Sequence, residues 1–202
     1  VPLLIKTARR GTNSDTQGRD AVWALAREHA LLTELAGVPG LPEAGELIAG
    51  AHASAIVRPY LHGETFWEVW TSPGARTPGV GARLGRALDE VEATLTALHA
   101  RGIVVRDVSA GNVLLGVDRA YLMDLELAER LDAPPPPYRR GTLGYFDPAK
   151  AREAAAGVAD DAFALRVLRG MAAEGVPALV AAYGADAAQV QLGRASAFPS
   201  TT

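Results

Sequence analysis

Three polar side chains surround a short hairpin pattern in the middle of this sequence. Asp107 and Asn112 precede an apolar run at residues 113–115, and Asp124 follows a second apolar run at residues 121–123. The residues between the two runs include the turn formers Gly and Asp, so we expect a β-hairpin. Antiparallel pairing of the two runs would bring all three polar side chains to one end of this hairpin.

The types of these side chains suit phosphoryl transfer. Carboxylate and amide oxygens are ligands that Mg²⁺ accepts, together with water and substrate phosphates. One carboxylate must stay free of metal, because it accepts the proton of the attacking hydroxyl group. Asp107, Asn112 and Asp124 supply both kinds of group. An isolated aspartate beside a hairpin is more often a turn residue, and this is the interpretation we give to Asp118.

The segments that contain these residues resemble two motifs of eukaryotic-like protein kinases. VRDVSAGN at residues 105–112 is similar to the kinase catalytic loop, and LMDLE at residues 122–126 is similar to the metal-binding loop. The resemblance implies that Asp107 is the catalytic base and that Asn112 and Asp124 hold Mg²⁺. It also implies ATP or GTP as the co-substrate.

Further motifs follow in the order that the same resemblance requires. GTLGYFDPA at residues 141–149 resembles the segment that closes the kinase activation loop, and DAFAL at residues 161–165 resembles the start of the helix beneath the catalytic loop. By resemblance, Thr142 orients the catalytic aspartate by hydrogen bonding, and Asp161 bonds the backbone of the catalytic loop. Arg106 is the arginine that in kinases often contacts a phosphorylated activation loop.

A lysine and a glutamate near the start of the chain complete the expected site. Residues 3–6 predict a strand that resembles the kinase strand with the phosphate-binding lysine, here Lys6. Residues 20–36 predict an amphipathic helix with Glu28 on its apolar stripe, where a carboxylate needs a cation. The resemblance makes Lys6 that cation. Two alternatives stay open: Glu28 reaches solvent at the edge of the stripe, or Glu34 is the partner of Lys6.

A second hairpin is expected over residues 46–49 and 53–61. By resemblance its end is the hinge of a kinase, where the nucleotide base bonds the backbone. The carbonyl of Pro59 and both backbone groups of Leu61 are available there. Arg58 stands where an apolar residue is expected, and a buried guanidinium at this position needs a partner that the sequence does not identify.

The remaining pattern indicates one α+β protein-kinase-like fold with two lobes. The N-lobe is reduced, because the first strands and the glycine-rich loop of a kinase do not precede Lys6. We expect a partial N-lobe over residues 1–61, a mainly helical C-lobe over 62–193 and a tail or linker over 194–202. The predicted loops and irregular segments are a polar loop over 7–19, a surface loop over 71–81 and a proline-rich segment over 131–140. The predicted helices are a short aromatic helix from 62, a helix over 82–100 with His99 as a cation near its end, and alanine-rich helices beyond 175.

Composition excludes several other classes of protein. The net charge is −3 and 49 % of the residues are hydrophobic, so no polybasic surface for nucleic acid or membrane is expected. No apolar run has the length of a membrane span, and the start does not have the layout of a signal peptide. We therefore expect a cytoplasmic location. Cysteine is absent, which excludes thiolate metal sites within these residues.

Within the kinases, the chain is most similar to the kinase domain of class III and IV lanthionine (lanthipeptide) synthetases. The similar segments are IKTARRG at residues 5–11, GRDAVWALAREHALLTELAGVPGLP at residues 18–42, and DLE in place of DFG. The resemblance implies a lanthipeptide precursor as the substrate, with separate lyase and cyclase domains as partners.

Two other functions stay open. A non-catalytic pseudokinase or remnant that binds a peptide or partner is favoured by the missing glycine-rich loop and by Arg58, Val105 and Ala149. A small-molecule phosphotransferase would share the two aspartates and the asparagine of the site.

Overall fold

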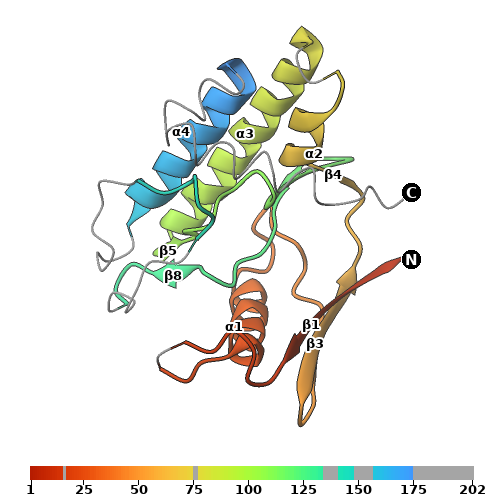
Figure 1. Cartoon of the computed structure of the whole chain (residues 1–202), viewed down its shortest axis with the longest axis vertical. Helices are drawn as coiled ribbons and strands as arrows, with labels where there is room; N and C mark the ends of the chain where they lie inside the picture. Colours follow the sequence, from red (N-terminus) through yellow and green to blue (C-terminus); the bar gives the residue numbers. More distant parts are fainter. Residues whose placement is uncertain (16, 75–76, 134–140, 148–156, 175–202) are drawn as a thin grey trace.

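The protein is described by a computed structural model that covers residues 1–15, 17–74, 77–133, 141–147 and 157–174 (Figure 1). Within these residues the chain is a mixed α and β protein with four helices and three small sheets. Several predictions lie outside the described residues: most of the proline-rich segment, Ala149, the alanine-rich helices beyond residue 175 and the tail at 194–202.

The first sheet has the strand order β1-β3-β2, with antiparallel pairing throughout. It is formed by β1 (Leu3–Arg9), β2 (Glu46–Ala49) and β3 (Ala53–Pro59). The predicted second hairpin is confirmed by β2 and β3. Strand β1 continues three residues beyond its predicted end, so the expected loop over residues 7–19 is wrong at its start. The reason is the pairing with β3, which extends to Arg9 opposite Ala53.

Helix α1 (Ala21–Glu34) covers one face of this sheet (Figure 1). Asp20 caps its first turn, because the Asp20 side chain accepts a hydrogen bond from the backbone N–H of Trp23. Leu25 packs against the sheet residues Ala8 and Ile56 in a small hydrophobic cluster. The predicted helix and its N-cap are confirmed.

The second group of elements contains the other predicted hairpin. Strands β4 (Gly63–Thr65), β6 (Val113–Gly116) and β7 (Ala120–Leu122) form a sheet in the order β4-β6-β7. The predicted hairpin is confirmed by the antiparallel pairing of β6 and β7, in which Val113 lies opposite Leu122.

Two element boundaries in this region differ from the prediction. Residues 63–65 form β4 and not the start of a helix, and Thr65 then caps α2 (Phe66–Thr71) through a capping box with Glu68. Helix α3 (Pro78–His99) begins inside the predicted loop over 71–81, because proline is well suited to the first turn of a helix.

The larger hydrophobic core lies among α2, α3 and α4 (Val158–Glu174); α2 and α3 also pack against the second sheet, and α4 packs against α3 (Figure 1). Phe66 is fully buried, as expected for the aromatic helix, and the Trp70 indole donates to the carbonyl of Met171. Two short strands, β5 (Ile103–Val104) and β8 (Glu129–Arg130), pair beside this core.

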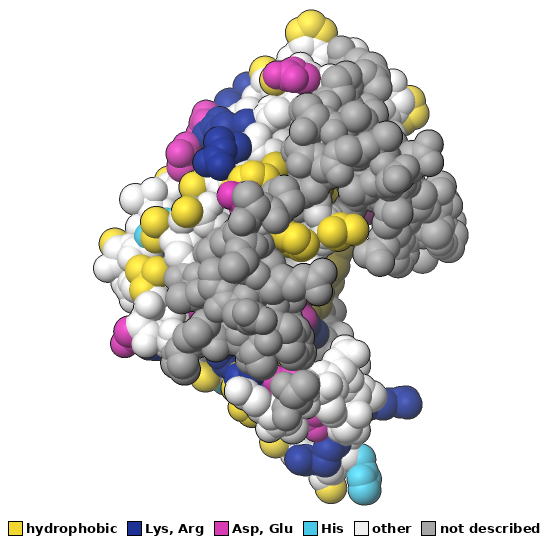
Figure 2. Space-filling model, turned by 60° about the vertical axis from the view of Figure 1, so that its left-hand side comes forward, with side chains coloured by type: hydrophobic (Ala, Val, Ile, Leu, Met, Phe, Trp, Pro, Cys, Tyr) yellow, Lys and Arg dark blue, Asp and Glu magenta, His cyan; other side chains and the backbone are white. Residues whose placement is uncertain are grey.

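The surface agrees with the mixed charge of the sequence. Figure 2 shows acidic and basic side chains interspersed on the visible face, without one extended basic patch among the described residues. None of the described helices combines the length and the apolar character needed to cross a membrane.

Candidate functional site

Lys6 is the centre of a cluster of charged side chains that come from distant parts of the chain. Its Nζ lies 2.5 Å from Glu28 Oε2 on α1 and 2.9 Å from Asp124 Oδ1 just after β7. Glu126 Oε2 is 3.8 Å away, and the three acids come within 4.8 Å of one another. The structure therefore brings the expected lysine and glutamate into contact and adds the aspartate after the hairpin. Glu34, the alternative partner, instead forms an exposed pair with Arg130, so that alternative is wrong.

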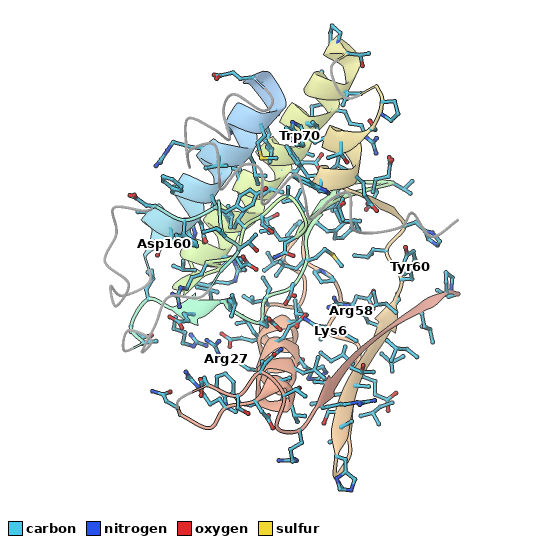
Figure 3. The ribbon with its side chains drawn as sticks, viewed as in Figure 1. Lys6, Arg27, Arg58, Tyr60, Trp70 and Asp160 are labelled. Carbon is cyan, nitrogen blue, oxygen red and sulfur yellow. The ribbon has the colours of Figure 1, made fainter. Side chains whose placement is uncertain are left out.

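Glu28 is buried between two cations. Its side chain has no exposed surface, so the alternative in which it reaches solvent is wrong. Glu28 Oε1 lies 3.7 Å from Arg58 Nη1, and neither atom has a hydrogen bond within the described residues. Arg58 reaches this position because Ser54, Ile56 and Arg58 alternate on the buried face of β3 (Figure 3). This glutamate is the partner that sequence reasoning did not find, although the alternation of β3 could have indicated it.

Burial and charge shift the pKa values of this group in different directions. Burial lowers the pKa of Lys6, but Asp124 and Glu28 outweigh it and leave this pKa above its ordinary value. Burial raises the pKa of Glu28, although Lys6 opposes the shift. Burial lowers the pKa of Arg58, opposed by Glu28. Lys6 therefore provides a firmly protonated point charge at the end of the hairpin.

Asp107 is held on both of its carboxylate oxygens. Asn112 Nδ2 donates to Asp107 Oδ2 and to the Asp107 carbonyl, each at 3.0 Å. The backbone N–H of Thr142 donates to Asp107 Oδ1 at 2.7 Å. Thr142 thus contacts the aspartate, as expected, but through its backbone and not through its hydroxyl group. These contacts orient the Asp107 carboxylate before any substrate is present.

Asp161 supports the same loop from helix α4. Its buried carboxylate accepts hydrogen bonds from the backbone N–H groups of Val105 and Arg106, at 2.9 and 2.7 Å. His99 Nε2 lies 2.8 Å from Asp161 Oδ2, a contact that the sequence interpretation of His99 as a helix-terminal cation missed. The histidine and the aspartate are 62 residues apart, so no local pattern signals their contact.

The expected hinge residues follow the sheet. Strand β3 ends at Pro59, and the backbone N–H of Tyr60 donates to the carbonyl of Pro2 at 3.0 Å. No hydrogen bond within the described part of the chain involves the backbone of Leu61, which connects β3 to β4. Leu61 thus keeps a donor and an acceptor free, as an adenine or guanine ring would require.

The end of the hairpin also offers oxygen ligands of the type that Mg²⁺ accepts. The backbone N–H of Met123 donates to the carbonyl of Asn112 at 2.7 Å, which ties the two strand ends together. Among the described residues, neither Asn112 Oδ1 nor Asp124 Oδ2 accepts a hydrogen bond. Two hard oxygens are therefore available, and this donor set fits Mg²⁺. Glu126 is a nearby acid that sequence reasoning did not assign.

Two acids beyond the hairpin were missed because their roles depend on packing. Burial, followed by the charge of Asp124, raises the pKa of Glu126. Glu129 forms an ion pair of 2.8 Å with Arg106, the residue before Asp107. The sequence signal for Glu126 is its place in DLE, whereas nothing local marks Glu129.

Comparison with known proteins gives partial matches. No protein-family model matches the chain. Over 57 residues, 28 % of the chain, it is 39 % identical to a protein of Acanthamoeba polyphaga mimivirus whose name classes it as a serine/threonine-protein kinase, and the match covers 20 % of that protein. Over 117 residues, 56 % of the chain, it is 31 % identical to a Plasmodium falciparum (isolate K1 / Thailand) protein named in the same class, of which it covers 22 %.

The chain therefore spans about a fifth of the length of the curated relatives it matches. Over part of its own length, it is similar to serine/threonine-protein kinases.

Proposed function

We propose that the chain is a kinase-like phosphotransferase that moves the terminal phosphoryl group of ATP or GTP to a serine or threonine hydroxyl of a peptide. The observation that carries this proposal is the position of Lys6, which contacts both Glu28 and Asp124. The hydrogen-bonded pair of Asp107 and Asn112 belongs to the same end of the hairpin. The partial similarity to serine/threonine-protein kinases supports the same reaction.

Each side chain has one role in the proposed reaction. Asp107 accepts the proton of the substrate hydroxyl, whose oxygen bonds the γ-phosphorus while the bond to the bridging oxygen breaks and the nucleoside diphosphate leaves. Lys6 neutralises phosphate charge as a compact ammonium, and Glu28 holds it in place. Mg²⁺, when bound by Asn112 and Asp124, supplies further neutralisation of the phosphates.

The finer part of the proposal concerns the fold and the substrate. The proposed fold is a two-lobed kinase arrangement, with the nucleotide base held at the Pro59 carbonyl and the Leu61 backbone. A lanthipeptide precursor is the proposed peptide, with separate lyase and cyclase domains acting on the phosphorylated product. Neither relative named above is a lanthionine synthetase, so this substrate rests on the motif resemblance alone.

Calorimetric titration tests nucleotide binding. ATP and GTP are titrated with and without Mg²⁺ into the parent chain, Asp124→Ala and Asp118→Asn. Asp118 is a matched control, because it lies in the turn of the same hairpin and its side chain contacts the nearby Tyr121 hydroxyl and the Arg119 side chain. We expect magnesium-dependent binding by the parent and by Asp118→Asn, and its loss in Asp124→Ala. No binding by the parent would end the phosphotransferase proposal.

A transfer assay then separates two candidate functions. With serine- and threonine-containing peptides, Asp107→Asn is expected to lower turnover by about a hundredfold or more while nucleotide binding is kept. A non-catalytic binding module is the second candidate. It is favoured by the buried Arg58, which shares Glu28 with Lys6. Nucleotide binding by the parent without transfer to any peptide would select this second candidate.

A further inference from the structure

Arg106, the residue before the proposed catalytic base, is held by two other parts of the chain. Its backbone N–H is bonded to Asp161 Oδ1 at 2.7 Å, and its Nη1 lies 2.8 Å from Glu129 Oε1. Only 7 % of the Arg106 side chain and 18 % of the Glu129 side chain are exposed. The backbone of Arg106 has φ of 68°, in the left-handed region that a bulky residue rarely adopts. Such a conformation persists where surrounding contacts fix it.

Glu129 reaches Arg106 because two short strands pair. Strand β8 lies against β5, with Glu129 directly opposite Val104, two residues before Arg106. Glu129 also lies shortly after Asp124 in the chain. Its contact with Arg106 therefore links the segment that begins at Asp124, the proposed metal ligand, to the loop that contains Asp107, the proposed base. One carboxylate thereby joins both halves of the candidate site.

A second arginine, Arg27, also interacts electrostatically with Glu129. Arg27 on α1 donates to the carbonyl of Glu126 at 3.4 Å, and its side chain faces the same region (Figure 3). Burial lowers the pKa of Arg27, whereas Glu129 raises it and Arg19 and Arg106 lower it further. The positive charges of Arg27 and Arg106 repel each other, and the negative charge of Glu129 offsets this repulsion. Without it, the cation of Arg106 would remain largely buried and would lose its nearest opposite charge.

We propose that Glu129 is a positioning residue for Asp107. Its carboxylate holds the Arg106 side chain and thereby fixes the backbone on which Asp107 is placed. This anion is part of the chain itself, so the contact forms without any added phosphate group. The inference rests on the proposed phosphotransferase function, in which Asp107 receives the proton of the substrate hydroxyl.

The test compares Glu129→Gln with Glu34→Gln, a control that removes the ion pair of the neighbouring residue on β8. Glu34→Gln removes an ion pair between α1 and Arg130, the residue next to Glu129, but this pair is exposed and does not include Arg106. Turnover at saturating nucleotide, KM for nucleotide and hydrogen exchange at residues 103–107 are measured for both variants. A displaced reacting group lowers the rate steeply, so Glu129→Gln is expected to lower kcat by about tenfold or more, with KM changed less than about twofold.

The conservative variant Glu129→Asp keeps the negative charge, and its kcat is expected to fall less than that of Glu129→Gln. Glu34→Gln is expected to leave kcat, KM and exchange at residues 103–107 unchanged. An unchanged kcat in Glu129→Gln, or an equal loss in Glu34→Gln, would overturn the proposal. If Glu129→Gln does not fold, Glu129→Asp takes its place, with a smaller fall in kcat expected and an unchanged kcat overturning the proposal.

Hydrogen exchange separates this inference from the proposed function. If the parent chain transfers no phosphoryl group, the proposed function fails, and exchange alone decides the role of Glu129. Faster exchange at residues 103–107 in Glu129→Gln, with α3 unchanged, supports the positioning role. Exchange equal to that of the parent chain overturns it.

Discussion

The carboxylate of Glu28 and the guanidinium of Arg58 lie 3.7 Å apart inside the protein without a hydrogen bond between them. Glu28 Oε2 at the same time contacts Lys6 at 2.5 Å. Glu28 therefore has one close partner, Lys6, and one more distant partner, Arg58. This difference predicts unequal consequences when the charges are removed one at a time.

Arg58→Met is expected to change the free energy of unfolding by less than about 1 kcal/mol. Glu28 keeps its ion pair with Lys6, and the methionine side chain fills the space of Arg58 without the cost of burying a charge. Glu28→Gln leaves two cations without their shared anion, and we expect a loss of about 3 kcal/mol. Urea unfolding of both variants measures the difference. A loss in Arg58→Met as large as that in Glu28→Gln would show that the looser pair carries the stability.

The titration of Lys6 gives a prediction at alkaline pH. Its pKa lies above the ordinary 10.5, because Asp124 and Glu28 outweigh the effect of burial. The folded protein then holds this proton more tightly than the unfolded chain does. The stability that the lysine contributes is therefore fully present below pH 10.5 and is lost as the pH rises through the raised pKa.

Two measurements check this behaviour. The chain has two lysines, Lys6 and Lys150, so lysine-selective NMR gives two side-chain signals, and Lys150→Arg assigns them. The Lys6 signal is expected to titrate later than a free lysine. The difference in unfolding free energy between the parent and Lys6→Met should shrink only above pH 10.5. A difference that vanishes near neutral pH would contradict the assigned direction of the shift.

Asp161 is predicted to be a large contributor to the stability of the loop that contains Asp107. Asp161→Ala leaves the backbone N–H groups of Val105 and Arg106 without their acceptor, and each such group costs about 1–3 kcal/mol. We expect a total loss of about 3 kcal/mol in urea unfolding.

The control for this change is Asp89→Asn. Asp89 forms an exposed ion pair with Arg169 between α3 and α4, and such pairs contribute about 0–1 kcal/mol. If both variants lose the same small amount, the hydrogen bonds of Asp161 are replaced by water, and its supporting role is rejected.

The contact between Thr142 and Asp107 predicts that turnover depends on the backbone N–H of Thr142 and not on its side chain. The donor is the backbone N–H, so Thr142→Ala is expected to keep the hydrogen bond and to leave turnover within about twofold of the parent. Thr142→Pro removes the N–H group and is expected to lower turnover by about tenfold or more. The peptide transfer assay measures both variants, with thermal unfolding to verify that each is folded. A large loss in Thr142→Ala would assign the role to the hydroxyl group instead.

The sequence by itself determined the elements that carry the site. Two apolar runs separated by turn residues were sufficient for the hairpin of β6 and β7. Helical spacing and the cap at Asp20 were sufficient for α1, and the place of Glu28 on its apolar stripe required a cation. Such signals are local, because each depends on residues that are neighbours along one element. The ends of β1 and α3 were less accurate and β4 was not predicted, since pairing and packing set these features.

Tertiary structure decided which charges meet. Glu28 and Arg58 are joined only because α1 lies on the sheet face toward which Arg58 points. His99 meets Asp161 across two packed helices, and Glu129 meets Arg106 because β8 pairs with β5. The physical reason is the same in each case. An ion pair depends on the distance between two side chains, and for residues far apart in the chain that distance is set by the packing of the elements between them.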